Sequence, residues 1–197
     1  MTDSSLCSVP SPWRRWAPWL ALAGVLLLAA IALRLEGRPW WCACREPTPF
    51  ALDPTGPHNS QHLFDPYSLT HFVKGLFYCG LLFWALPKVP WTWRLILAVG
   101  LEAAWEVIEN SPPVIERYRT ATIAAGYQGD TLVNSLGDIA SSGVGFLLAR
   151  RLGLWWSATI VVATEVLVLL WIRDNLTLAT VMLVIPLDSV KTWQTGG

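Results

Sequence analysis

The chain has 197 residues, of which 53% are hydrophobic and 14% are charged, and its 14 basic and 14 acidic residues give a formal net charge of zero. A composition this apolar favours a lipid environment over a soluble domain, so membrane lipids are the expected surroundings. The balanced charge excludes nucleic acid as a partner, because nucleic-acid binding requires a basic surface.

Five apolar segments are long enough to cross a membrane as helices, which requires roughly 20 mostly apolar residues each. In chain order they are residues 16–33, 69–86, 93–109, 131–149 and 154–171. A sixth stretch, residues 176–190, is short and contains Pro186 and Asp188, so it is re-entrant, interfacial or a thin span. The sequence therefore predicts an all-α fold, a polytopic transmembrane helical bundle with five to six membrane segments.

This bundle is expected to form one domain, residues 16–190, between an N-terminal tail of residues 1–15 and a C-terminal tail of residues 191–197. Many of the 13 Trp residues lie near the ends of apolar runs, which is typical of the membrane interface. Arg14 and Arg15 precede the first segment, whereas almost every loop carboxylate falls on the other side. The pattern favours a cytoplasmic N-terminus, with Lys191 on the same side.

Two long connections, residues 34–68 and 110–130, then lie on the outer side. Both are rich in proline, with Pro112 and Pro113 adjacent in the second. Proline punctuates regular structure, so we expect irregular loops without further helices.

Three of the predicted helices each carry ionisable or amide side chains on a single face, at spacings of three or four residues. They are His71 and Lys74 in the second helix, Glu102, Glu106 and Glu109 in the third, and Asp130, Asn134 and Asp138 in the fourth. A charge at the bilayer centre costs at least about 2.5 kcal/mol, so it is retained where it is paired or useful. We expect the three faces to meet in one polar cavity of the outer leaflet, below the loop of residues 58–65.

The candidate catalytic residues are Glu102, Glu106, Asp138, His71 and Lys74. Within this set, Glu106 or Asp138 is the expected general base, and His71 or Lys74 its electrostatic partner.

The candidate binding residues are His62, Asp65, Glu109, Asp130 and Asn134. The alternative for both sets is interhelical hydrogen bonding without any activity, including a purely architectural ion pair between Lys74 and Glu106. Glu165 stands alone on its helix and is interpreted as a packing or lipid-boundary exception.

Metal ligands are a further possibility in the first outer loop. His58, His62, Asp65 and His71, with Glu109 or Asp130, offer imidazole and carboxylate groups to zinc or a similar ion, although solvated or capping histidines are the commoner outcome.

The same loop contains Cys42-Ala43-Cys44, a spacing at which a disulfide closes only with strain. A metal pair, a reactive dithiol and an unremarkable loop all stay open for these cysteines. The standard motifs of soluble enzymes do not occur, and no cofactor is expected.

A resemblance to a known family is carried by four segments: residues 58–68 (HNSQHLFDPYS), 101–112 (LEAAWEVIENSP), 127–138 (YQGDTLVNSLGD) and 172–178 (IRDNLTL). On these segments the chain resembles a bacterial inner-membrane family known as domain of unknown function 2585, or uncharacterised protein family 0314. The resemblance covers residues 16–194 and implies a multi-pass protein of the bacterial cell inner membrane. It implies no activity.

A fainter similarity reaches the VanZ-like membrane proteins of glycopeptide resistance. It rests on Asp130, Asn134 and Gly137, and on the His71-Phe72 pair, whereas the spacing from Asp65 to His71 departs from the usual pattern. This similarity points toward cell-envelope or lipid-linked chemistry.

Three functions are compatible with these residues. The first is binding or processing of an envelope lipid headgroup in the outer-leaflet cavity. The second is an accessory or assembly subunit whose polar faces bind partner helices, which makes a membrane protein a candidate partner. The third is a small proton- or ion-coupled carrier that uses the carboxylates as a relay.

Overall fold

The computed structural model describes residues 12–196, and this part of the chain is all helical, as predicted. Its seven helices are α1 (Pro12–Leu35), α2 (Ser68–Ala85), α3 (Trp91–Glu109), α4 (Pro112–Ala121), α5 (Leu132–Ile172), α6 (Leu176–Val184) and α7 (Asp188–Thr195). Residues 1–11 of the expected N-terminal tail lie outside the described residues.

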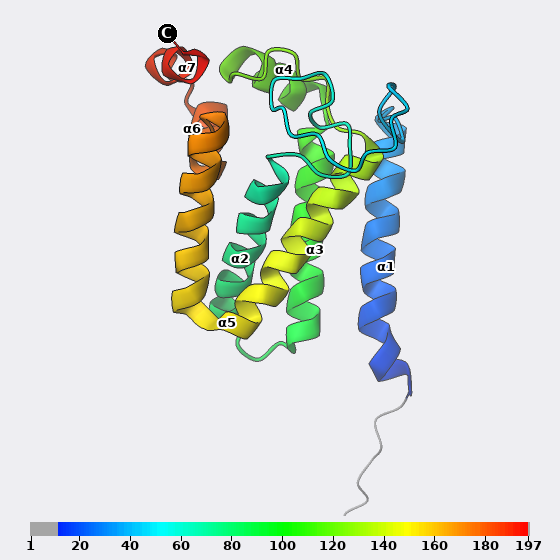
Figure 1. Ribbon diagram of the computed structural model, residues 1–197. Coiled ribbons are helices and arrows are strands. Elements are labelled where there is room, and N and C mark those ends of the chain that lie inside the picture. The colour runs from blue at the N-terminus through cyan, green and yellow to red at the C-terminus, as the bar shows by residue number, and fades with distance from the viewer. Residues whose placement is uncertain (1–11, 197) are drawn as a thin grey trace, which may run out of the picture.

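Helices α1, α2, α3 and the first arm of α5 pack together lengthwise (Figure 1). The start of α1, the α2–α3 turn and the bend in α5 lie at one end. The long connection after α1, together with α4 and α7, lies at the other end. The expected grouping of the two long connections at one end is therefore observed.

Helix α5 is divided into two arms at Gly153, where the backbone leaves the helical region with φ 77° and ψ 179°. A positive φ of this size is accessible to glycine at little cost because it has no Cβ atom. The chain reverses direction there and the second arm returns toward α6 (Figure 1). The break matches the predicted boundary between residues 131–149 and 154–171.

Two helices of the described chain are long and apolar enough to cross a membrane by length and composition, Trp16–Leu35 and Leu132–Ile172. The second of these spans 41 residues and includes the Gly153 reversal.

Two expectations about the connections are wrong. The second long loop contains helix α4, which begins at Pro112. Proline is compatible with the first turn of a helix, because the N–H groups there have no intrahelical acceptor.

The predicted sixth segment is two short helices, α6 and α7, separated around Pro186. The Lys191 ammonium donates a hydrogen bond to the Thr120 carbonyl in α4, at 2.8 Å. This contact shows that the sixth segment does not return to the side where α1 begins. Lys191 and the helical C-terminal segment therefore lie at the end with the long connections.

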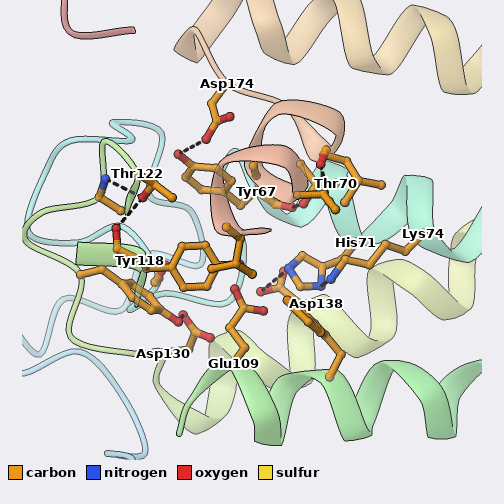
Figure 2. A pocket seen from close by; sticks show the side chains of 18 of the residues that line it. Tyr67, Thr70, His71, Lys74, Glu109, Tyr118, Thr122, Asp130, Asp138 and Asp174 are labelled. Carbon is orange, nitrogen blue, oxygen red and sulfur yellow. Dashed lines mark hydrogen bonds and ion pairs between the residues drawn. The ribbon is translucent and has the colours of Figure 1, made fainter. Parts of the chain in front are cut away.

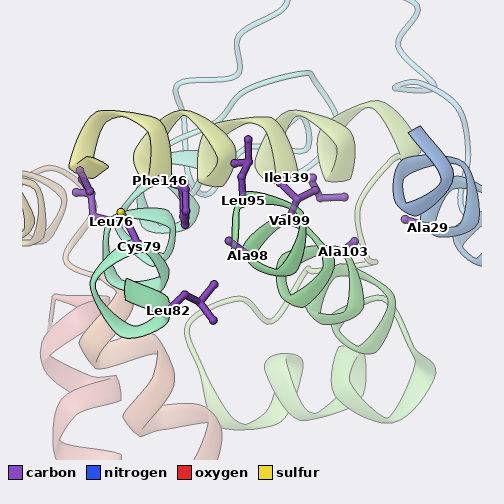
Figure 3. Packing of buried hydrophobic residues seen from close by; sticks show 11 residues of the cluster. Ala29, Leu76, Cys79, Leu82, Leu95, Ala98, Val99, Ala103, Ile139 and Phe146 are labelled. Carbon is purple, nitrogen blue, oxygen red and sulfur yellow. The ribbon is translucent and has the colours of Figure 1, made fainter. Parts of the chain in front are cut away.

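The apolar core lies between α1, α2, α3 and the first arm of α5 (Figure 3). It consists of Ala29, Leu76, Cys79, Leu82, Leu95, Ala98, Val99, Ala103, Ile139, Phe146 and Ala149. Several of these residues are alanines, which allow helices to approach closely.

Glycines bring α2 and α5 closest together. A Cβ atom on Gly75 would overlap the Ser142 carbonyl oxygen of α5, and one on Gly145 would overlap the Phe72 carbonyl oxygen of α2. Gly137 makes a similar approach to the Leu63 carbonyl. The Gly75 and Gly145 contacts fix the axial position of α2 relative to α5.

Gly75→Ala should therefore destabilise the protein by about 1–3 kcal/mol or more, because a methyl group forced against backbone atoms displaces a helix. Gly80→Ala, in the same helix with open space at its Cβ position, is the matched control and should be neutral or slightly stabilising. Thermal unfolding of the purified variants measures the difference. Equal midpoints for the two variants would contradict close α2–α5 packing.

Candidate functional site

His71 is the centre of a buried polar cluster contributed by α2, α3 and α5. Its Nδ1 atom lies 2.6 Å from Glu102 Oε1 and 3.1 Å from Glu106 Oε1, both on α3. Its Nε2 atom lies 3.9 Å from Asp138 Oδ2 on α5. The three polar faces predicted from helical spacing therefore do meet.

The geometry around Nδ1 separates the roles of the two glutamates. A single N–H can point at only one of them, and the shorter distance assigns it to Glu102. Both carboxylate oxygens of Glu106 then lack a hydrogen-bond partner among the described residues, although the side chain is fully buried. Buried polar groups are normally satisfied, so Glu106 is positioned for an additional donor.

Lys74 pairs with Glu102, whose Oε1 atom accepts a hydrogen bond from the ammonium at 3.1 Å. The Lys74–Glu106 pair of the architectural alternative is not observed, because the partner of Lys74 lies one helical turn earlier on α3. Because α2 and α3 run in opposite directions, moving one turn along α2 from His71 to Lys74 corresponds to moving one turn back along α3, from Glu106 to Glu102. The Lys74 ammonium also lies 4.9 Å from the centre of the Trp105 ring.

A second buried polar group surrounds Asp130, just before α5. Its carboxylate accepts hydrogen bonds from the Asn110 amide at 2.8 Å and from the Tyr127 hydroxyl at 3.0 Å. Burial, together with the nearby negative charge of Glu109, raises the pKa of Asp130 well above its ordinary value.

Asp65 has a structural role at the start of α2. Its carboxylate accepts hydrogen bonds from the backbone N–H groups of Tyr67 and Ser68, at 2.8 and 3.1 Å. It also accepts one from the Ser60 N–H at 2.9 Å, which fastens the preceding loop to the helix terminus.

A cavity of about 420 Å³ opens beside these groups. His71, Lys74 and Asp138 lie on one side of it, as Figure 2 shows, and Glu109 and Asp130 extend this polar wall. The opposite wall consists mostly of apolar residues of α6, namely Leu176, Ala179, Leu183 and Val184. The cavity therefore has one acidic wall and one apolar wall.

The predicted site residues divide into three groups relative to this cavity. His71, Lys74, Glu109, Asp130, Asp138 and Asp65 line it.

Glu102 and Glu106 lie behind His71, outside the cavity lining. Asn134 is also outside the lining, buried and without a side-chain hydrogen bond among the described residues. His62 lies elsewhere, where its Nδ1 atom contacts the Thr48 carbonyl. The predicted metal set of His58, His62 and Asp65 with His71 is consequently not brought together.

Sequence reasoning missed the aromatic and loop residues of the cavity. Tyr67, Tyr118 and Tyr127 line it, as does Asp174. Three tyrosines scattered over two loops and a short helix have no periodicity, so only the tertiary fold reveals their common location.

The sequence suggested that Glu165 is a packing or lipid-boundary exception, and this interpretation is wrong. Its carboxylate accepts hydrogen bonds from the N–H groups of Leu176 and Thr177, at 3.1 and 3.0 Å, and from the Thr177 hydroxyl at 2.7 Å. A carboxylate at a helix N-terminus satisfies the free N–H groups of the first turn. Glu165 thereby anchors α6, which forms the apolar wall of the cavity.

Asp174, just before α6, links this helix to the start of α2, because its carboxylate accepts a hydrogen bond from the Tyr67 hydroxyl at 3.3 Å. Burial raises the pKa of Asp174 to about 6. Because the folded-state pKa exceeds the unfolded-state value of about 3.9, the contribution of Asp174 to stability is fully present below about pH 4. It is lost as the pH rises through 6.

Asp174→Asn should remove this pH dependence, since an amide does not titrate. Between pH 4 and pH 7 the wild type should lose up to roughly 3 kcal/mol of stability relative to the variant. Thermal unfolding midpoints across that pH range measure the difference in slope. Tyr67→Phe, which removes a hydrogen bond to the carboxylate, should move the window to higher pH. Parallel pH curves for wild type and Asp174→Asn would contradict the buried carboxyl group.

Comparison with known proteins gives one clear relationship. The profile of a family described as "Protein of unknown function (DUF2585)" matches residues 33–196. The chain belongs to the DUF2585 family. No solved structure shows a significant match to it.

Several curated relatives share the UPF0314 designation. The UPF0314 protein of Sphingopyxis alaskensis is 41% identical over 179 residues, which cover 91% of this chain and 95% of the relative. The corresponding protein of Rhizobium meliloti is 43% identical, with 93% of each chain covered. That of Paracoccus denitrificans is 40% identical, with 92% of this chain and 94% of the relative covered. The family resemblance seen in the sequence is confirmed, and the VanZ-like similarity stays a prediction.

Proposed function

We propose that this DUF2585 protein is an inner-membrane protein that binds an amphiphile of the cell envelope, a molecule with a polar headgroup and an apolar tail. The observation that carries the proposal is the cavity with an acidic wall around His71 and an apolar wall on α6. A soluble polar metabolite would leave the apolar wall unused, whereas an amphiphile matches both walls.

The proposal includes five membrane crossings, formed by α1, α2, α3 and the two arms of α5. Helices α2 and α3, with 18 and 19 residues, are about 27–28 Å long, close to the roughly 30 Å hydrocarbon core. Two glutamates of α3, Glu102 and Glu106, point inward and are fully buried. The second arm of α5 instead exposes large apolar side chains, such as Trp155 at 84% and Leu170 at 78%, which favours contact with lipid over water.

A cytoplasmic N-terminus is supported by the basic residues at the end where α1 begins. Lys88 lies in the α2–α3 turn, and Arg150 and Arg151 lie beside the Gly153 reversal. Basic residues in short connections stay on the cytoplasmic side. The cavity, near the opposite end, would then face the outer leaflet.

The charged residues of the cavity limit the chemical class of headgroup that can bind there. Among the described residues, five carboxyl groups line the cavity, whereas Lys74 is the only lysine or arginine in its lining. The carboxyl groups belong to Asp65, Glu109, Asp130, Asp138 and Asp174. Carboxyl oxygens accept hydrogen bonds, so the favoured headgroup carries hydrogen-bond donors, as hydroxyl or ammonium groups do.

His71 is the residue that we propose to transfer a proton to or from this headgroup. Glu102 holds Nδ1–H, which leaves Nε2 toward the cavity beside Asp138. A carboxylate that fixes one ring nitrogen sets the tautomer and makes the other nitrogen a base. The roles expected from sequence are thus rearranged: Glu102 is a positioning residue and His71 is the candidate base.

Binding is tested by extraction of the full-length protein in mild detergent, followed by mass spectrometry of the lipids that copurify. Leu183→Trp fills the apolar wall of the cavity and should abolish enrichment of the bound lipid class. Leu170→Trp makes the same change on the exposed face of α5 and should retain it. Identical lipid profiles in wild type and Leu183→Trp, at equal protein abundance, would refute the binding site.

Proton transfer is tested in cells that lack the gene. We expect an altered envelope-lipid composition, which the wild-type gene restores and His71→Gln does not, although the variant accumulates in the membrane normally. If His71→Gln restores the composition, the protein binds without catalysis. If the variant instead leaves a larger complex on native gels, the accessory-subunit function is correct.

A further inference from the structure

A second cluster of chemically reactive side chains lies in the connection between α1 and α2, separate from the His71 cluster. It contains Cys42, Cys44, His58 and His62, and one potential ligand atom from each lies within 4.8 Å of all the others. Cys42 and His62 are buried, and Cys44 and His58 are partly buried. The cluster brings the Cys42-Ala43-Cys44 segment together with His58 and His62 of the same loop.

Each sulfur faces an imidazole nitrogen. Cys42 Sγ lies 3.5 Å from His58 Nδ1, and Cys44 Sγ lies 3.5 Å from His62 Nε2. In a tetrahedral zinc site, bonds of about 2.3 Å to sulfur and 2.0–2.1 Å to nitrogen place these two atoms about 3.6 Å apart. Both sulfur–nitrogen separations are therefore close to the edge length of such a tetrahedron.

His62 is oriented as a metal ligand would be. Its Nδ1 atom lies 2.5 Å from the Thr48 carbonyl oxygen, which can only accept a hydrogen bond. Nδ1 must then carry the proton, and Nε2 presents a lone pair toward Cys44. A backbone carbonyl that fixes the far nitrogen is the usual support of a histidine ligand.

The structure joins Cys42 and Cys44 in a disulfide, so metal binding requires the dithiol form of the chain. Cysteines are thiols when the chain is synthesised, and no reductant is needed before the ion binds. A disulfide alone would give no reason for two imidazole nitrogens to converge on the two sulfurs. The convergence therefore favours a ligand set over a simple cross-link.

We propose that Cys42, Cys44, His58 and His62 form a zinc site in the reduced protein. Two thiolates and two imidazoles suit Zn²⁺, and four protein ligands are typical of a structural site. Binding releases the two thiol protons and leaves the oxidation state of the metal unchanged.

The site has a specific structural role. Residues 36–67, between α1 and α2, contain no helix, and the zinc ion would cross-link two parts of this segment. Asn59, Ser60 and Asp65, close to the histidine ligands in the chain, line the cavity described above. The ion would fix the loop that borders the cavity, whichever molecule binds there.

The test uses the full-length protein, produced with added zinc and purified in mild detergent with a phosphine reductant. Elemental analysis should give one zinc ion per chain. After chelation, Co²⁺ alone should restore the visible bands of a tetrahedral thiolate-bound cobalt ion. Zinc should also raise the thermal unfolding midpoint of the chelated wild type, because it binds the folded state.

Matched variants locate the ion. Cys44→Ser and His58→Gln should each lose zinc and the cobalt bands. Cys79→Ser removes a buried cysteine outside the cluster, and His71→Gln removes the histidine of the other polar cluster, so both should keep one zinc ion.

Three results would overturn the proposal: zinc content unchanged in both Cys44→Ser and His58→Gln, zinc lost only in His71→Gln, or fully reduced wild type that binds neither zinc nor cobalt. The cobalt spectrum is recorded on wild type, so the test of metal binding itself does not depend on the folding of any variant. The lipid measurements are independent of it as well.

Discussion

The close contact between α2 and α5 determines where every other part of the site lies. Gly75 and Gly145 let the two backbones approach until each carbonyl occupies the space of a missing side chain. At that separation His71 on α2 comes within reach of Asp138 on α5. Helix α3 packs against both helices and completes the cluster with its glutamates. A wider α2–α5 separation would leave the Asp138 carboxyl group buried without the His71 imidazole.

Burial makes this cluster energetically demanding. Charges removed from water are tolerated when they are paired and hydrogen-bonded, and removing one partner leaves the other uncompensated. Lys74 and His71 are the basic groups that contact the carboxylates, and they share Glu102. Glu106 and Asp138 retain oxygens without hydrogen bonds among the described residues. Buried acceptors without hydrogen bonds carry a free-energy cost, and their position near the cavity supports the proposed binding of a ligand there.

Much of the fold was predictable from the sequence because helical periodicity and apolar length are local properties. The ends of α2 and α3, and the break near Gly153, follow from such local signals. The contact of His71 with Glu102 and Asp138 was also predictable, since charged groups buried in a helical bundle are stabilised by pairing with opposite charges. The register between α2 and α3 was not predictable, because the one-turn shift that pairs Lys74 with Glu102 depends on helix packing. The tyrosines of the cavity and the capping role of Glu165 depend on loop conformation, which residue spacing does not encode.

Helix α6 is attached to the remainder of the protein by hydrogen bonds at its two ends and by the buried Met182 side chain. Glu165 caps its start, and the Arg117 guanidinium in α4 donates to the carbonyls of Leu183 and Val184 at its finish. The four-helix core, by contrast, is held by interlocking side chains and glycine contacts. Under the proposed binding of an envelope amphiphile, a displacement of α6 away from the core would open the cavity laterally. The apolar tail of the ligand could then enter from the bilayer without crossing water.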